Sequence, residues 1–371
     1  MSSQRPPYRA DHVGSLLRPP RLLAARERFG RGEISAEALT EAEDEAIRGA
    51  VAMQESLGLE SATDGEFRRA SWHMDFIYQL GGISKTEGQI AVAFRNENET
   101  LSFTPSGLAV DGPVHLDQPI FASAFVSLAS MVTTATPKLT IPSPSMVHYR
   151  GGRAAIDPVV YPDLDAFWVD LAAAYRDEVA ALANLGCTYL QFDDTSLAYL
   201  NDPAQRAYIA AQGGDPDHQH ETYIETINNA IASRPESMSI TTHLCRGNFR
   251  SSWAAEGGYD FVAEALFGGL DVDGFFLEFD DARSGGFEPL RFVPDKKRVV
   301  LGLVTTKRGE LERKDDLKRR IDEASAYVPL DHLCLSPQCG FSSTLEGNAL
   351  SYDEQVAKLA LVVETAEEVW G

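Results

Sequence analysis

The sequence is poor in cysteine, in basic residues and in long hydrophobic runs. Only 4 of its 371 residues are cysteine, too few for the disulfide framework of a small secreted domain. Its 33 lysine and arginine residues face 55 acidic residues, and the resulting net charge of −22 argues against a nucleic-acid-binding protein. No apolar run approaches the roughly 20 residues that cross a bilayer, so we expect no membrane span.

The composition is otherwise that of an ordinary globular protein, with 44% hydrophobic and 24% charged residues. The polar N-terminal arm, Met1–Pro7, has no apolar core of signal-peptide length. We therefore expect a cytoplasmic protein that acts on small molecules. The sequence is compatible with a homo-oligomer and does not fix the number of subunits.

Short apolar runs alternate with amphipathic stretches along the chain. In the stretch 163–185, apolar residues recur every three or four positions, which predicts a helix that Asp163 caps and Gly186 ends. Further helices are expected at 40–57, opened by Thr40 and Glu43 at capping-box spacing, and at 353–370. The eight apolar runs are 10–15, 59–66, 138–142, 187–194, 237–245, 273–280, 299–305 and 332–339.

Eight such alternations favour an α/β fold of the (β/α)8 TIM-barrel type, formed by residues 1–371 as a single domain. A doubly wound sheet is the competing fold, but no Gly-x-Gly-x-x-Gly motif follows the first run. The gap between the second and third runs is too long for one helix. We therefore expect an inserted β-hairpin or meander over residues 81–130.

Four residues of the types that bind zinc stand where the later strands end. His243 and Cys245 close the fifth run, Glu278 the sixth and Cys339 the eighth. Chemistry in such barrels is placed at the carboxyl ends of the strands, where these side chains converge. From the ligand types alone, inert buried cysteines beside a core histidine are an equally good interpretation.

Five motifs in the same order resemble the C-terminal catalytic barrel of the cobalamin-independent methionine synthases, and the resemblance covers essentially the whole chain. Together they are far more specific than any one of them. The motifs are His12-Val13-Gly14-Ser15, Thr63-Asp64-Gly65-Glu66, Leu190-Gln191-Phe192-Asp193-Asp194, His243-Leu244-Cys245 and Ser336-Pro337-Gln338-Cys339-Gly340.

The resemblance implies a zinc site made by His243, Cys245, Glu278 and Cys339. Zinc removes the proton from a coordinated thiol and keeps the sulfur nucleophilic, and the harder carboxylate is the ligand expected to give way to a substrate sulfur.

The resemblance also implies the substrate contacts. Glu66 and Asp193 match positions that hold the homocysteine ammonium, and Gly14 and Ser15 match the turn that takes its carboxylate.

The departures from the family concern the methyl donor. The full-length enzymes have two barrels, whereas this sequence has residues for one. Around His148 there is no tryptophan where those enzymes stack the pterin, and Lys307 stands where they place a proton-donating histidine. We take Lys307 and His148 as candidate catalytic residues, Lys307 as a proton donor or as the partner of an anion. Arg246 replaces a neutral residue after Cys245.

The leading interpretation is a zinc-dependent methyltransferase that makes methionine from homocysteine, with a folate or a methyl-corrinoid protein as the donor. The alternative is a zinc-dependent alkyltransferase acting on coenzyme M or another small thiol, by corrinoid-dependent methyl transfer or epoxide opening, with Arg246 and Lys307 on a sulfonate. A third is a non-catalytic zinc- or thiol-binding barrel.

Overall fold

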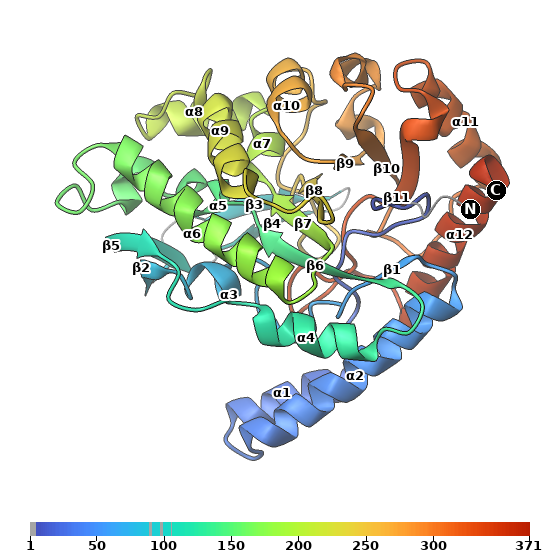
Figure 1. Ribbon diagram of the computed structural model, residues 1–371. Coiled ribbons are helices and arrows are strands. Elements are labelled where there is room, and N and C mark those ends of the chain that lie inside the picture. Colours follow the sequence, from blue (N-terminus) through green and yellow to red (C-terminus); the bar gives the residue numbers. More distant parts are fainter. Residues whose placement is uncertain (1–4, 89–90, 97–98, 105) are drawn as a thin grey trace.

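A curled parallel sheet forms the centre of the molecule (Figure 1). The computed structural model describes residues 5–88, 91–96, 99–104 and 106–371. Within them, seven parallel strands lie in the order β1-β6-β7-β8-β9-β10-β11, so seven of the eight expected runs contain a strand. The strands are β1 (Ser61–Ala62), β6 (Thr136–Pro142), β7 (Tyr189–Asp194), β8 (Ser239–Leu244), β9 (Gly274–Glu278), β10 (Arg298–Val304) and β11 (Leu333–Pro337).

The first expected run, 10–15, is not a regular strand. Its backbone forms a single parallel bridge, from Ala10 to Leu335 of β11. Toward β1 it is held by side chains instead, because the Ser61 hydroxyl donates to the Asp11 carboxylate (2.9 Å) and the Thr63 hydroxyl donates to the Gly14 carbonyl (2.6 Å). These hydroxyl contacts replace a backbone ladder, and a closed ring of eight regular strands is not formed by the described residues.

A buried ion pair fixes this first segment inside the sheet. The Lys138 ammonium lies 3.2 Å from the Asp11 carboxylate and donates to the His12 carbonyl (2.6 Å). Tyr189 donates its hydroxyl to the other Asp11 oxygen (2.7 Å). Because a buried charge is tolerated only when it is paired and hydrogen-bonded, these contacts pin the segment that leads to Gly14.

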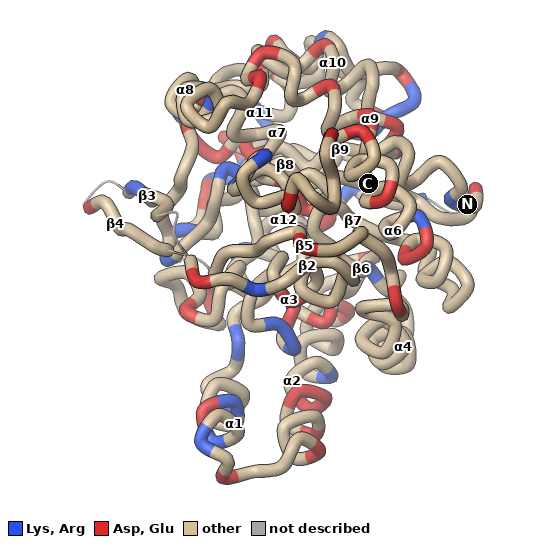
Figure 2. The backbone as a smooth tube through the Cα atoms, turned by 90° about the vertical axis from the view of Figure 1, so that its left-hand side faces the viewer, with Lys and Arg blue, Asp and Glu red and all other residues tan. Residues whose placement is uncertain are grey.

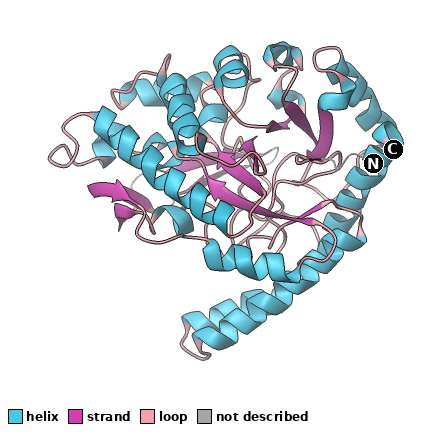
Figure 3. Cartoon of the chain, in the orientation of Figure 1, coloured by secondary structure: helices cyan, strands magenta, loops and turns pink. Residues whose placement is uncertain are grey.

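Helices cover the outer face of the sheet (Figure 3). The α-helices are α1 (Pro20–Gly30), α2 (Ala36–Ser56), α3 (Met74–Ile77), α4 (Ala122–Met131), α5 (Ser145–Tyr149), α6 (Leu164–Asn184), α7 (Ser196–Tyr199), α8 (Pro203–Ala211), α9 (Gln219–Ile231), α10 (Ala263–Gly269), α11 (Lys314–Ser325) and α12 (Tyr352–Trp370). Short 3-10 turns span Gly152–Ala155, Ala282–Ser284, Glu288–Phe292 and Leu330–His332. Among the described residues, no helix is long and apolar enough to traverse a bilayer.

The α1–α2 pair projects from the rest of the chain and carries side chains of both charges (Figure 2). Arg21 pairs with Glu45, and the Arg26 guanidinium lies 2.9 Å from the Glu43 carboxylate. The expected start of the second helix is wrong. Ser35 caps α2, whereas Thr40 lies inside it and donates its hydroxyl to a carbonyl of the preceding turn.

The ends of α6 follow the sequence prediction. The Asp163 carboxylate accepts hydrogen bonds from the backbone N–H groups of Asp165 and Ala166, and Gly186 adopts φ +91° after the last turn. We expect Asp163→Ala to lower the free energy of unfolding by about 1 kcal/mol, since it removes the N-cap. Urea denaturation measures this, with Asp165→Ala as the matched control. Equal losses in the two variants would show that capping is not the cause.

Residues 81–130 contain two antiparallel strand pairs and a helix. β2 (Gly81–Thr86) pairs with β5 (Gly107–His115), and β3 (Val92–Arg95) pairs with β4 (Thr100–Phe103). The expected extent of the β region is wrong at its C-terminal end, because α4 occupies 122–131. Phe125 and Leu128 are three positions apart, which places both on the buried side of that helix.

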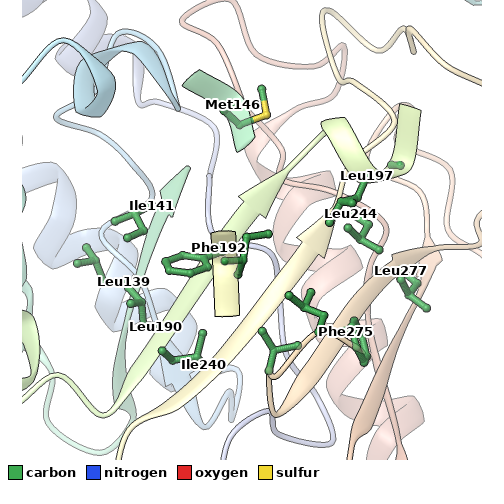
Figure 4. Packing of buried hydrophobic residues seen from close by; sticks show 14 of the residues in the cluster. Leu139, Ile141, Met146, Leu190, Phe192, Leu197, Ile240, Leu244, Phe275 and Leu277 are labelled. Atoms are coloured by element: carbon green, nitrogen blue, oxygen red, sulfur yellow. The ribbon is translucent and has the colours of Figure 1, made fainter. Parts of the chain in front are cut away.

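The strands alternate between a helix-facing and an interior side (Figure 4). The helix-facing side is apolar and includes Leu139, Ile141, Leu190, Phe192, Ile240, Phe275 and Leu277, all buried. The period of two then turns the residues between them to the interior, among them Thr140, Asp193, His243 and Glu278. The pattern that builds the core therefore also sends polar residues of four neighbouring strands to one enclosed region.

Candidate metal centre

Four potential metal ligands meet at the carboxyl end of the sheet. His243 lies in β8, Cys245 directly after it, Glu278 ends β9 and Cys339 follows β11. One ligand atom from each lies within 4.8 Å of the other three. His243 and Cys245 are two residues apart in extended backbone, so both side chains point to the same side. The structure thus brings together all four residues predicted as ligands.

The donor set fits zinc. Both ring nitrogens of His243 are buried and have no hydrogen-bond partner in the described part of the chain. The sulfur atoms of Cys245 and Cys339 lie 3.5 Å apart, and the thiol of Cys245 beside Cys339 holds the pKa of the Cys339 thiol well below its usual range. A buried imidazole, two sulfurs and a carboxylate at these separations are the ligands of a tetrahedral zinc site. This fit rests on the donor atoms.

Glu278 is the ligand that the surrounding protein holds most closely. One carboxylate oxygen accepts from the backbone N–H of Arg246 (2.9 Å) and the other from the guanidinium of Arg283 (3.2 Å). Burial raises the pKa of Glu278, and the nearby cations Lys307 and Arg283 reduce that increase.

A cavity of about 750 Å³ opens onto this cluster of candidate ligands. It is wide enough for a substrate far larger than an amino acid. The predicted site residues in its wall are Ser15, Glu66, Asp193, His243, Cys245 and Cys339. Gly14 lies beside it at φ +146°, where an added Cβ would come within 2.8 Å of the Thr140 side chain.

Glu66 and Asp193 form a buried pair of carboxylates in this wall. Burial, and then the nearby Glu66 carboxylate, raise the pKa of Asp193 to about 7. Burial raises the pKa of Glu66 as well, although Thr140 donates its hydroxyl to that carboxylate (2.9 Å). Glu66 also adopts φ +61°, a conformation that a non-glycine residue rarely takes. Two buried like charges oppose each other's ionisation. The Arg69 guanidinium, 3.6 Å from the Glu66 carboxylate, offsets part of that repulsion, and a bound ammonium group would offset more of it.

Neither of the two predicted catalytic residues lines the cavity. Lys307 pairs with Asp280 (3.3 Å) and is not part of the cavity wall. The His148 ring is hydrogen-bonded to the Tyr223 hydroxyl (3.0 Å) and lines a second cavity of about 280 Å³. Burial lowers the pKa of His148 to about 4, so the ring is neutral at pH 7. The structure therefore does not bring either residue into the cavity with the metal ligands.

Arg246 also turns away from the cavity. Its guanidinium donates to the carbonyls of Gly257 (3.0 Å) and Glu278 (2.9 Å) and to the Tyr259 hydroxyl (3.0 Å). A sulfonate in the cavity would therefore not meet this side chain, because its donors are directed into the protein.

Several lining residues were not assigned from the sequence. The rings of Trp72 and His73 lie 4.3 Å apart and line the cavity. Phe94 and Phe103 of the β3–β4 pair also line it, and Phe103 stacks on Phe249 at 4.7 Å. The sequence predicted an inserted hairpin in this region, but it gave no sign that residues of the hairpin would line the cavity.

The chain is similar to known proteins over nearly its whole length. The family model described as "Cobalamin-independent synthase, Catalytic domain" matches residues 10–368. The uncharacterized protein YxjH of Bacillus subtilis is 45% identical, over 99% of this chain and 96% of its own length. A crystal structure from Listeria monocytogenes, described as a candidate vitamin-B12-independent methionine synthase, is 38% identical with a TM-score of 0.78 over 99% of both chains. The 5-methyltetrahydropteroyltriglutamate–homocysteine methyltransferase of Bacillus licheniformis is 23% identical, over 97% of this chain and 42% of its own length.

Proposed function

Because the chain belongs to the family of cobalamin-independent synthase catalytic domains, we propose that it is a zinc-dependent methyltransferase that converts homocysteine to methionine. The observation that carries the proposal is one cavity wall that contains three of the four cluster residues, His243, Cys245 and Cys339, together with an acidic pair, Glu66 and Asp193. The first feature suits a thiol and the second an ammonium group, and homocysteine has both.

The residues of this chain have separate tasks in that reaction. His243, Cys245, Glu278 and Cys339 would hold zinc, which when bound lowers the pKa of a coordinated thiol. Glu66 and Asp193 bind the substrate ammonium, and this orients the sulfur toward the cluster. Ser15 and the backbone at Gly14 receive the carboxylate. We further propose that segment 10–15 takes the position of the eighth strand of a (β/α)8 barrel. In this position Gly14 and Ser15 lie beside Glu66.

The substrate test is a panel of thiols against several methyl donors. Homocysteine, coenzyme M and cysteine are each incubated with zinc-loaded protein, and thioether formation is measured by mass spectrometry. We expect methionine to be the main product. Product from coenzyme M with none from homocysteine would favour the alternative alkyltransferase. The positions of Lys307 and Arg246 outside the cavity favour homocysteine, because neither cation is directed at a bound sulfonate.

The methyl donor gives a separate prediction. We expect methyltetrahydrofolate triglutamate alone to be a poor donor, because the sequence next to His148 has no tryptophan to stack a pterin, and Trp168, whose ring lies 4.9 Å from His148, does not line the cavity beside the ligand cluster. Initial rates with this folate and with a methyl-corrinoid protein measure the preference. Robust turnover with the folate alone contradicts the prediction.

A further inference from the structure

A guanidinium group lies directly behind the metal ligand Glu278. Arg283 belongs to the short turn Ala282–Ser284 that follows β9, and its side chain is only 6% exposed. Its Nη2 atom donates to Glu278 Oε2 (3.2 Å) and to Asp280 Oδ1 (3.1 Å), and its Nη1 atom contacts Asp281. Asp280 and Asp281 therefore hold the guanidinium of Arg283 in place, while its Nη2 atom also contacts the Glu278 carboxylate.

The edge of Arg283 that faces a carboxylate is only half used. Its Nε atom is buried and has no hydrogen-bond partner within the described residues. Nε and Nη2 project two parallel N–H bonds from one edge of the planar group, the geometry that binds both oxygens of a carboxylate. Nη2 already contacts Glu278, so a small rotation of that carboxylate would satisfy the orphaned Nε as well.

The cavity is lined by three of the four cluster residues. Of the four cluster residues, His243, Cys245 and Cys339 line the cavity and Glu278 does not. A thiol that enters through the cavity therefore meets the cluster at these three residues and not at Glu278. The carboxylate is also the hard oxygen ligand in a set with two sulfurs, so it is the ligand most readily exchanged for a further sulfur.

A carboxylate released at this place would be a buried anion. Two cysteine thiolates and a substrate thiolate already outweigh the charge of zinc, so the released Glu278 needs another cation nearby. Arg283 is next to Glu278 and supplies this cation. Lys307 also pairs with Asp280 (3.3 Å), so Asp280 does not neutralise Arg283 alone. The backbone N–H of Arg246 donates a hydrogen bond to the second Glu278 oxygen.

We propose that Arg283 is a positioning residue that receives the Glu278 carboxylate, through Nε and Nη2, when a substrate thiolate takes its place at the metal. The exchange forms one metal–sulfur bond and breaks one metal–oxygen bond. The thiol proton passes to solvent water, and no atom is oxidised or reduced. This inference rests on the metal site of the proposed function, but not on homocysteine being the thiol.

Cobalt(II)-substituted protein provides the test, because sulfur-to-cobalt charge-transfer absorption reports each sulfur that joins the metal. Wild type, Arg283→Gln and Arg283→Lys are titrated with homocysteine and, separately, with coenzyme M. The exposed Arg291 lies in a neighbouring turn and donates to the Glu288 carbonyl, so Arg291→Gln is the matched control. Cobalt content is measured in every variant before thiol is added.

We expect Arg283→Gln to retain about one cobalt per chain at saturating cobalt and to bind thiol roughly 10- to 100-fold more weakly, the range that the loss of one hydrogen bond to a charged group implies. Arg283→Lys keeps the charge but loses the two-pronged edge, so an intermediate affinity is expected. Arg291→Gln should match wild type. Unchanged thiol affinity in Arg283→Gln, or loss of cobalt from both Arg283 variants before thiol is added, overturns the proposal.

The two thiols separate this inference from the proposed function. If wild type responds to coenzyme M and not to homocysteine, the homocysteine assignment fails, and the Arg283 variants are judged with coenzyme M. If neither thiol adds a sulfur to cobalt in wild type, the exchange does not occur and the role of Arg283 is wrong.

Discussion

Cys339→Ser is expected to lose zinc almost completely, while Cys334→Ser keeps about one zinc per chain. Cys339 lies 3.5 Å from the Cys245 sulfur inside the ligand cluster. Its replacement removes a thiolate, and a serine hydroxyl does not ionise at neutral pH to replace it. Altering a mere partner of a ligand costs about 10- to 100-fold in metal affinity, so loss of the ligand itself should exceed that range.

Cys334 is a stringent control for this experiment. It lies in β11, five residues before Cys339, and burial raises the pKa of its thiol to about 12. Its sulfur therefore stays protonated at neutral pH and lies outside the cluster. Metal analysis of proteins purified without chelator gives the result. Folded wild type with almost no metal, or equal metal loss in the two variants, contradicts the zinc assignment.

Asp193→Asn is expected to lower kcat/KM for homocysteine by roughly 10- to 100-fold, because a hydrogen bond to a charged group contributes about 1.5–3 kcal/mol. The substitution keeps the shape of the side chain and removes the charge that faces the substrate ammonium. Zinc content should stay the same, since Asp193 is not among the ligands. Steady-state kinetics with zinc-loaded protein measures the loss, and Glu66→Gln should produce a similar one.

A thiol without an amino group is the control for the acidic pair. If Glu66 and Asp193 bind an ammonium group, both variants should retain whatever turnover or binding wild type has with coenzyme M. Equal losses for homocysteine and coenzyme M would mean that the pair supports the cavity rather than the amine. Wild type that ignores homocysteine altogether would favour the alternative substrate class.

The ligand cluster could be predicted because it depends on strand ends and on a period of two. His243 and Cys245 are two residues apart at the end of an apolar run, which places both on the interior face in any parallel sheet. Glu278 and Cys339 stand at the ends of the sixth and eighth runs, whose strands are separated by β10. The five-motif resemblance then identified them as a set, which is what the ligand types alone did not do.

The sequence was less informative where a side chain leaves a loop rather than a strand. Lys307 and Arg246 follow strand ends, but the direction of each depends on partners distant in sequence, Asp280 for one and Tyr259 for the other. His148 is similar, because α5 turns it toward Tyr223 of α9. Long-range partners of this kind leave no periodic signal.

Local patterns misled at two helices for a different reason. Thr40 and Glu43 have capping-box spacing, but Ser35 offers an earlier cap, and the added turn extends α2 to Ala36. The segment 122–131 reads as part of a β region, yet it forms α4 because Phe125 and Leu128 are buried on one helix face. A competing local cap therefore decided the start of α2, whereas tertiary packing decided α4 over local propensity.

The central claim is that a substrate sulfur binds to zinc held by His243, Cys245, Glu278 and Cys339. X-ray absorption at the zinc edge tests it most directly, with zinc-loaded wild type and selenohomocysteine, because selenium scatters differently from every protein ligand. The account predicts a selenium atom in the first coordination shell of zinc when the ligand is bound. Bound selenohomocysteine with only protein sulfur, nitrogen and oxygen around zinc would contradict it.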